Sequence, residues 1–318
     1  MHPQDYTSGV GEQTAYVTPL LWFTLVVSVL VCLIISALVW RGATRRAIGA
    51  SSADLRSVPV ERREGGVRWI WIGVAVSMVP LLITLFWTVG VLAKIGPIPR
   101  TAPLAINITA KQWWWDAEYE AGPASERFHT ANEIHIPINV PVLVRLKSAD
   151  VIHSFWVPKV AGKMDVIPGQ TNTMWIQANK VGRYRGQCAE FCGSQHAHMA
   201  FVVAADLPAD YAAWRANQLR PAPAPVGVEQ QHGLEIAESR CSLCHAIRGT
   251  RAASPIGPDL THLKSRSAIG AGTLPNTLAA LSGWIENPQG PKPGARMPAQ
   301  TLSGPDLTDL TAYLETLR

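Results

Sequence analysis

Charged residues are scarce in this chain: Asp, Glu, Lys and Arg make up 16% of its 318 residues. Two segments, from about residue 16 to 40 and from about 69 to 93, contain none of them. Each exceeds the roughly 20 apolar residues with which a helix crosses a bilayer, and each is long for a core helix. The sequence therefore predicts a transmembrane helical hairpin over residues 16–95, with helices at about 16–40 and 69–94.

Positive charge is also missing from the start of the chain, where the only charged residues are Asp5 and Glu12. Without a basic segment before it, and at this length, the first apolar segment is not expected to be a cleaved signal peptide. The loop at 41–68 is instead rich in arginine (Arg41, Arg45, Arg46, Arg56, Arg62, Arg63 and Arg68). Basic loops stay on the cytoplasmic side, so we expect both chain ends, including the tail at 1–15, outside the cytoplasm. The net charge of +5 comes mostly from this loop and indicates topology, not nucleic-acid binding.

No internal repeat is visible, and the composition changes twice along the exported part. Between residues 96 and 207, short segments rich in β-branched and aromatic residues, such as PVLVRLKSA and TNTMWIQA, alternate with Pro, Gly and Asn. This pattern is typical of an all-β sandwich or barrel. We expect a short helix and a Pro-rich linker, RPAPAPVG, within 208–227, and a helical domain at 228–318.

The segment GQCAEFCGSQHAHM, residues 186–199, gathers soft metal ligands. Cys188, Cys192, His196 and Met199 offer two thiolates, an imidazole and a thioether, a set that favours copper over hard cations. Zinc would accept the cysteines and the histidine but rarely uses methionine. A copper site of this kind needs a second histidine from elsewhere in the fold. His153, at the start of the strand HSFWVP, is the best candidate.

Three alternatives stay open for this segment. The two cysteines could form a disulfide, which the exported side permits, although that would leave the clustered His, Met and Glu unexplained. His198 rivals His196 as the ligand from the loop. Chance clustering is the third alternative. His129 and His135 are more typical of surface or strand positions.

The motif Cys241-Ser-Leu-Cys244-His245 is that of a c-type heme, in which the cysteines form thioethers and the histidine binds the iron. Half of a zinc site would look similar, but no second pair of ligands follows at a suitable spacing. Met297 is the only methionine after Met199 and is the expected sixth ligand. A His–Met pair raises the heme potential, as suits an electron carrier near a copper acceptor.

These motifs, together with MDVIPGQTN and KQWWWDAEYE, resemble subunit II of the heme–copper cytochrome c oxidases. The resemblance implies a cupredoxin-like Greek-key sandwich at 96–207 and a binuclear copper centre, CuA, bridged by both cysteines. It assigns the other copper ligands to His153, His196, Met199 and the backbone carbonyl of Glu190. It also implies that the Glu190 side chain binds Mg at the interface with subunit I. Trp113 would lie above the copper as the point where electrons arrive.

A class I cytochrome c domain at 228–318 beside a CuA domain is similar to the cytochrome c-fused, caa-type subclass. The resemblance implies a two-pass protein of the bacterial inner membrane, embedded in lipid, with both redox domains on the periplasmic or extracellular side. It would pass electrons from an external or membrane cytochrome through heme c and CuA to heme in subunit I, with subunit III as a further partner. Reduction of oxygen to water and proton pumping would occur in subunit I.

Other classes share part of this pattern. A CuA-bearing reductase of nitrous or nitric oxide would have the same copper loop. A copper-delivery protein would have no use for a heme, and a quinol oxidase subunit would lack the copper ligands.

Overall fold

The structure is a computed structural model that describes residues 4–44, 66–99, 102–120, 123 and 126–318. It forms two compact units: Tyr16–Pro97 is one, and the described residues before and after it make up the other. Most of the loop predicted to be cytoplasmic, 41–68, lies outside the described residues, and with it Arg45, Arg46, Arg56, Arg62 and Arg63.

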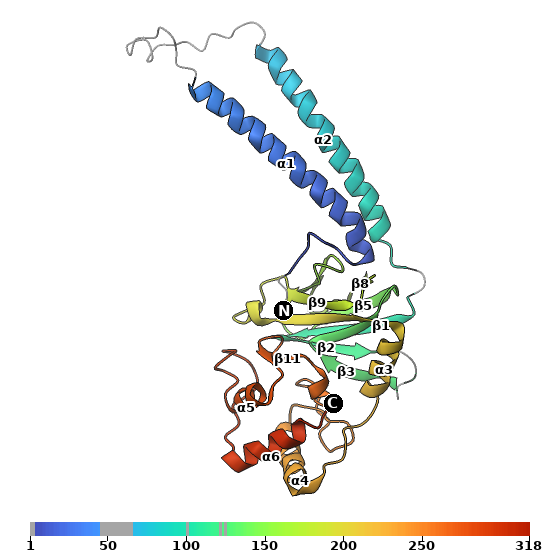
Figure 1. The fold of residues 1–318 in the computed structure, drawn as a ribbon, viewed down its shortest axis with the longest axis vertical. Coiled ribbons are helices and arrows are strands. Elements are labelled where there is room, and N and C mark those ends of the chain that lie inside the picture. Colours follow the sequence, from blue (N-terminus) through green and yellow to red (C-terminus); the bar gives the residue numbers. More distant parts are fainter. Residues whose placement is uncertain (1–3, 45–65, 100–101, 121–122, 124–125) are drawn as a thin grey trace, which may run out of the picture. The chain divides into compact units, whose positions relative to one another are not determined.

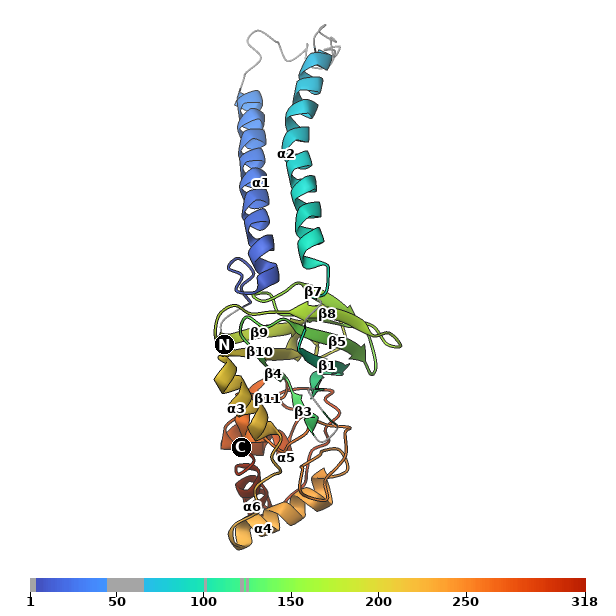
Figure 2. The same cartoon turned by 90° about the vertical axis from the view of Figure 1, so that its right-hand side faces the viewer.

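The first unit is built from two long helices, α1 (Glu12–Thr44) and α2 (Gly66–Ile95), which run side by side in Figures 1 and 2. Each contains one predicted span and is slightly longer than it. In the most apolar window of each helix no residue is buried, so the apolar side chains face outward. The rings of Phe23 and Trp87 meet between the helices, with centroids 5.4 Å apart. Helices that expose apolar side chains all round are suited to a membrane, and both are long enough to cross one.

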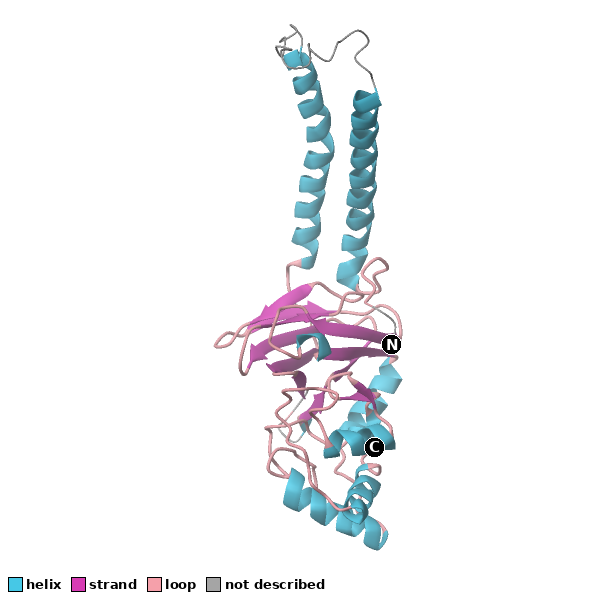
Figure 3. Cartoon of the chain, turned by 90° about the vertical axis from the view of Figure 1, so that its left-hand side faces the viewer, coloured by secondary structure: helices cyan, strands magenta, loops and turns pink. Residues whose placement is uncertain are grey.

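Two five-stranded sheets form the β domain of the second unit, in the orders β3-β2-β1-β5-β8 and β4-β10-β9-β6-β7. Figure 3 shows these strands in magenta. Two neighbouring pairs, β1 with β5 and β4 with β10, are parallel, and the other pairs are antiparallel. The strands are β1 (Leu104–Lys111), β2 (Trp114–Tyr119), β3 (Phe128–Ala131), β4 (Glu133–Pro137), β5 (Val142–Ser148), β6 (His153–Trp156), β7 (Lys163–Val166), β8 (Asn172–Ile176), β9 (Gly182–Cys188) and β10 (Ala200–Asp206).

The two sheets enclose one apolar core, as the alternation along the strands predicts. Residues of β1 and β2 alternate between buried and half-buried positions. The rings of Trp115, Phe155 and Phe201 are fully buried, with Phe155 stacked on Phe201 at 4.5 Å between centroids. Cys188 and Cys192 belong to the same core. The predicted β sandwich is confirmed, and the two cysteines of the candidate copper site are anchored in its interior.

A helical domain follows in the same unit. Helix α3 (Pro208–Gln218) precedes it and packs on the β domain through Tyr211 and Trp214. The elements of the helical domain are α4 (Gly227–Ile236), the π-helical turn η4 (Ala237–Cys241), the 3₁₀ turn η5 (Leu263–Ser265), a short hairpin of β11 (Ala268–Ile269) and β12 (Leu274–Pro275), α5 (Leu278–Glu286) and α6 (Gly304–Leu314). A second apolar core lies among them and includes Leu281, Leu310 and Tyr313. The predicted helical C-terminal domain is confirmed, with the hairpin as an addition.

Helices α4 and α6 approach each other at a glycine. A Cβ atom added at Gly233 would lie 2.0 Å from the backbone oxygen of Asp309 and 2.8 Å from the Cβ of Tyr313. Real Cβ atoms do not come this close to backbone, so only glycine permits this crossing.

Replacing Gly233 with alanine is therefore expected to force α4 and α6 apart and to lower the free energy of unfolding of the helical domain by about 2–3 kcal/mol or more. Denaturant unfolding followed by circular dichroism would measure this loss. Gly283→Ala in α5 is the matched control, because a Cβ there meets nothing within 4 Å. It should be neutral or slightly stabilising, and an equal loss in both variants would contradict the packing argument.

Candidate copper and heme sites

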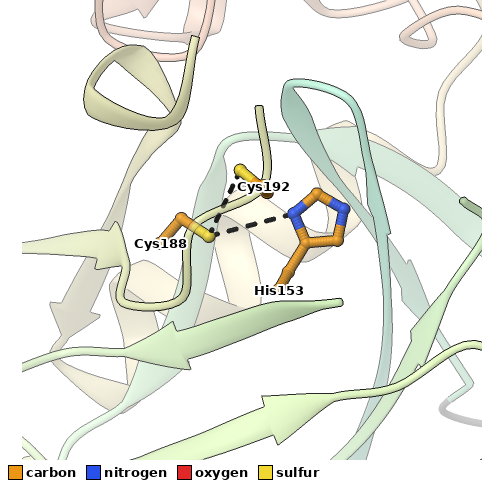
Figure 4. Close-up of side chains that lie close together, drawn as sticks. All are labelled: His153, Cys188 and Cys192. Atoms are coloured by element: carbon orange, nitrogen blue, oxygen red, sulfur yellow. Dashed lines mark hydrogen bonds between the residues drawn. The ribbon is translucent and has the colours of Figure 1, made fainter. Parts of the chain in front are cut away.

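Two cysteine sulfurs and a histidine ring meet inside the β domain (Figure 4). Cys188 is the last residue of β9, Cys192 lies in the loop that follows, and His153 begins β6. Their ligand atoms lie within 4.8 Å of one another, and all three residues are buried. The sulfurs are 3.7 Å apart, and Cys188 Sγ lies 3.8 Å from His153 Nδ1. A disulfide needs about 2.05 Å, so these thiols are free and open to a shared metal.

The rest of the loop adds three more donors to the same place. His196 Nδ1 lies 3.7 Å from Cys192 Sγ, and Met199 Sδ lies 3.8 Å from that sulfur. The backbone oxygen of Glu190 lies 3.2 Å from Cys188 Sγ. The two sulfurs lie in the middle, with an imidazole near each, a thioether on one side and a carbonyl on the other. Such a set of soft donors favours copper.

The pKa of each thiol depends on the other thiol. Their mutual hydrogen bond lowers the pKa of Cys188 and raises that of Cys192. The pair therefore gives up its first proton readily and its second reluctantly. Since thiolates are the ligands, metal binding must displace that second proton, and copper uptake should release protons.

Asp150 fixes the orientation of His153, a role that no sequence motif indicated. Its Oδ1 lies 2.8 Å from His153 Nε2, which leaves Nδ1 facing Cys188. Burial would raise the pKa of Asp150, but hydrogen bonds from His153 and from the backbone amides of Gln112 and Val151 outweigh it and lower that pKa. Carboxylates that hold the second nitrogen of a ligating histidine are typical of metal sites.

The heme motif lies where α4 ends. Cys241 closes η4, and Cys244 and His245 follow in the next turn. His245 Nδ1 donates to the backbone oxygen of Pro258 at 2.7 Å, which leaves Nε2 free for an iron. Burial lowers the pKa of His245 and so favours the neutral, ligating form. Met297 and Cys241 both pack against the apolar core of this domain. These residues fit a c-type heme.

Comparison with known proteins agrees with both sites. Residues 120–206 match the family described as cytochrome c oxidase subunit II, periplasmic domain, and residues 230–318 match cytochrome c. A cytochrome c oxidase subunit 2 of Bacillus sp. (strain PS3) is 31% identical over 254 residues, which cover 76% of this chain and 69% of that protein. The chain belongs to the cytochrome c oxidase subunit II family.

A further relative agrees with this membership, and one solved structure is similar over part of the chain. Subunit 2 from Alkalihalophilus pseudofirmus is 38% identical over 215 residues, 67% of this chain, and the match spans 61% of that relative's length. The solved periplasmic domain of subunit II of cytochrome oxidase from Bradyrhizobium japonicum is 33% identical, with a TM-score of 0.36, over 38% of this chain and 96% of that one. The fused cytochrome c domain places this member of the family with the caa-type subunits II.

Within this subunit II the geometry separates the two rival loop histidines. His196 faces Cys192, whereas His198 Nδ1 bonds Gln195 Oε1 at 2.7 Å. Residue spacing alone left this choice open, and the family resemblance assigned His196. Both histidines lie in the 3₁₀ turn η3 (His196–His198). His129 and His135 lie elsewhere, one paired with Asp116 and the other held in β4 between two carboxylates.

The three adjacent tryptophans have three different environments. Trp115 is buried in the core, and Trp114 lies under the ammonium of Lys111, 4.6 Å from the ring centroid. Trp113 precedes β2, so strand alternation does not govern it; its Nε1 donates to the backbone oxygen of Cys192 at 2.9 Å. Trp115 also reaches this loop from the core side, where its Nε1 donates to the backbone oxygen of Met199 at 3.4 Å. Trp113 is therefore the half-buried tryptophan that hydrogen-bonds to the copper loop.

Replacing His196 with alanine is expected to weaken copper binding by at least about 100-fold, since even indirect partners of ligands contribute 10- to 100-fold. His198→Ala is the matched control two residues away and should keep full copper content. Copper per chain after dialysis against a chelator measures both. Loss of copper in the His198 variant alone would reverse the assignment.

Asp150→Asn should weaken copper binding by about 10- to 100-fold, because the amide no longer fixes the tautomer of His153. Asp116→Asn, which breaks the comparable pair with His129 on the domain surface, is the control. Chelator competition at fixed pH would compare the two. Equal affinities in both variants would show that Asp150 does not orient the ligand.

Proposed function

We propose that this chain is the subunit through which electrons enter a heme–copper terminal oxidase. It would pass them from a cytochrome c donor through heme c and CuA to heme in subunit I, where oxygen is reduced to water and protons are pumped. The observation that carries the proposal is the assembly of six copper donors in one loop and one strand end, in the same compact unit as a heme-attachment motif.

We assign each cofactor to the residues that would hold it. Cys188 and Cys192 would bridge the two copper ions of CuA, and the other donors around them are His153, Glu190 O, His196 and Met199. Cys241 and Cys244 would hold heme c, with His245 and Met297 as axial ligands. When bound, these centres each accept and release one electron. The chain contributes a rigid setting, because the copper donors are fixed in a packed β sandwich and cannot rearrange freely.

Trp113 supports direct transfer between the two centres, because it contacts both domains. It donates a hydrogen bond to the Cys192 carbonyl, and residues of the cytochrome c domain lie against it. A Cβ atom at Gly294, three residues before Met297, would lie 3.6 Å from Trp113 Cη2. Here the partner of Trp113 would thus be the protein's own heme domain, in place of a separate cytochrome.

Membrane setting and remaining partners follow from the same proposal. Helices α1 and α2 would anchor the chain in the lipid of a bacterial inner membrane, with both termini and both redox domains on the periplasmic or extracellular side. Subunits I and III would be the oxidase partners. The Glu190 carboxylate is exposed beside the copper loop, where it is free to bind Mg at the boundary with subunit I.

Electron paramagnetic resonance on the purified chain, loaded with copper and heme, tests the proposal. We expect a mixed-valence signal from one electron shared over two copper ions, beside a low-spin heme signal. After rapid reduction of the heme, the copper signal should disappear when the electron passes from the heme to the copper pair, because the fully reduced pair has no unpaired electron. A single-copper signal, or copper that exchanges freely with a chelator, would instead favour copper delivery. The large subunit that co-purifies separates an oxidase from a nitrous or nitric oxide reductase.

A further inference from the structure

A lysine of the cytochrome c domain is buried in the β domain. Lys292 lies between α5 and α6 and is 3% exposed. Its Nζ donates to the backbone oxygens of Trp113 at 2.7 Å, His198 at 2.9 Å and Gly270 at 2.9 Å. His198 belongs to the copper loop of the β domain, Trp113 hydrogen-bonds to that loop, and Gly270 belongs to the cytochrome c domain. One side chain therefore ties the heme-binding domain to the copper loop and to the tryptophan beside it.

The three acceptors match an ammonium group. An ammonium has three N–H donors and no acceptor, whereas a neutral amine has two donors and would leave one carbonyl unpaired. Burial lowers the pKa of Lys292 to about 7, which is a cost of placing the charge here. Lysine is almost never fully buried unless it is paired, so a residue placed at this cost has a specific role.

The residues beside Lys292 continue the contact toward the heme ligand. Gln195 Nε2 donates to the backbone oxygen of Pro293 at 2.7 Å. At the next position, Gly294, an added Cβ would come 3.3 Å from Ser194 Oγ and 3.6 Å from the Trp113 ring. The loop that carries Met297 is thus held against the copper loop over several consecutive residues.

A second buried charged group, this time from the β domain, also joins the two domains. Glu133, in β4, accepts from Ser267 N at 3.0 Å and Ser267 Oγ at 2.8 Å, and pairs with Arg183 at 2.6 Å. Nearby, the backbone amide of Ala200 donates to the oxygen of Ala271 at 3.1 Å. Each domain therefore contributes one buried charged group to polar atoms of the other.

The linker is held as well. Ala222 N donates to the oxygen of Arg248 at 2.8 Å, and His262 Nε2 lies 3.1 Å from the oxygen of Arg220. Both contacts fix the Pro-rich linker to the surface of the cytochrome c domain, so it does not act as a free tether.

We propose that Lys292 is a positioning residue that locks the cytochrome c domain onto the copper loop, with the Met297 loop against Trp113. Electrons then pass between two docked domains, and a heme domain swinging on its linker is not part of the mechanism. This rests on the proposed function, and it adds that an external donor reaches only the heme domain, because Trp113 is covered by residues 292–294.

Amide hydrogen exchange on the full chain with copper and heme bound tests the lock without reference to activity. The amide of Ala200 is the reporter, since its hydrogen bond crosses between the domains. Lys292→Met keeps the length of the side chain and removes all three donors. We expect exchange at Ala200 to become about tenfold faster or more, while amides within α6 keep their wild-type rates.

Lys264→Met is the matched control. Lys264 is also largely buried, but its Nζ bonds Asn276 and Glu315, both in its own domain. This variant should speed exchange in α6 and leave Ala200 unchanged. Unchanged exchange at Ala200 in Lys292→Met, or the same increase in both variants, would overturn the lock.

Internal electron transfer gives a second measurement, made first in the wild-type chain. With the domains locked, transfer from heme to copper should not depend on solvent viscosity or ionic strength. In Lys292→Met it should slow and become sensitive to both, with the heme and copper spectra unchanged. If the wild-type heme never reduces the copper, the proposed function fails; if it does so only in a viscosity-dependent way, the lock fails and the function stands.

Discussion

The sulfurs of Cys188 and Cys192 lie 3.7 Å apart, which is close enough to bind the same metal and too far for a disulfide. The candidate copper site depends on this spacing. The connection between β9 and β10 sets this spacing. Cys188 is held in place as the last residue of β9, and Cys192 is held by its burial in the core of the sandwich. His153 is brought in by β6, which pairs with β9, and is held by Asp150. A change in strand register would separate these groups, so the β sandwich is the condition for the copper site.

The cytochrome c domain is built on the same principle of fixing ligands by packing. Gly233 allows α4 to cross α6 closely, and the end of α4 leads into η4, which presents Cys241. His245 is oriented by the carbonyl of Pro258, as His153 is by Asp150. In both sites the free nitrogen of the imidazole is selected by the hydrogen bond that the other nitrogen makes.

Contact between the two domains holds the copper loop beside the loop that carries Met297, as the proposed electron path requires. The contact is polar and carries a buried charge from each side, Lys292 from one domain and Glu133 from the other. Unpaired buried charges are costly, so this arrangement is specific: a shifted docking would take the ammonium of Lys292 away from Trp113 O and His198 O and would break the bonds from Ser267 to Glu133. Apolar surfaces would allow sliding, whereas these bonds fix which residues of the heme domain face Trp113.

The sequence by itself determined the two apolar helices, which follow from two long segments without charged residues. It also determined the β sandwich and the helical domain, which follow from the composition pattern of each segment, and the ligand types, which follow from the spacing of Cys, His and Met. Residue spacing did not separate His196 from His198, because the two are two residues apart in a 3₁₀ turn that no alternation rule covers; the family resemblance favoured His196, and the tertiary structure places His196, not His198, beside Cys192. Asp150 and Lys292 also belong to no sequence motif that indicated their roles. Their roles arise from contacts between segments distant in the chain, and such contacts leave no local pattern in a single sequence.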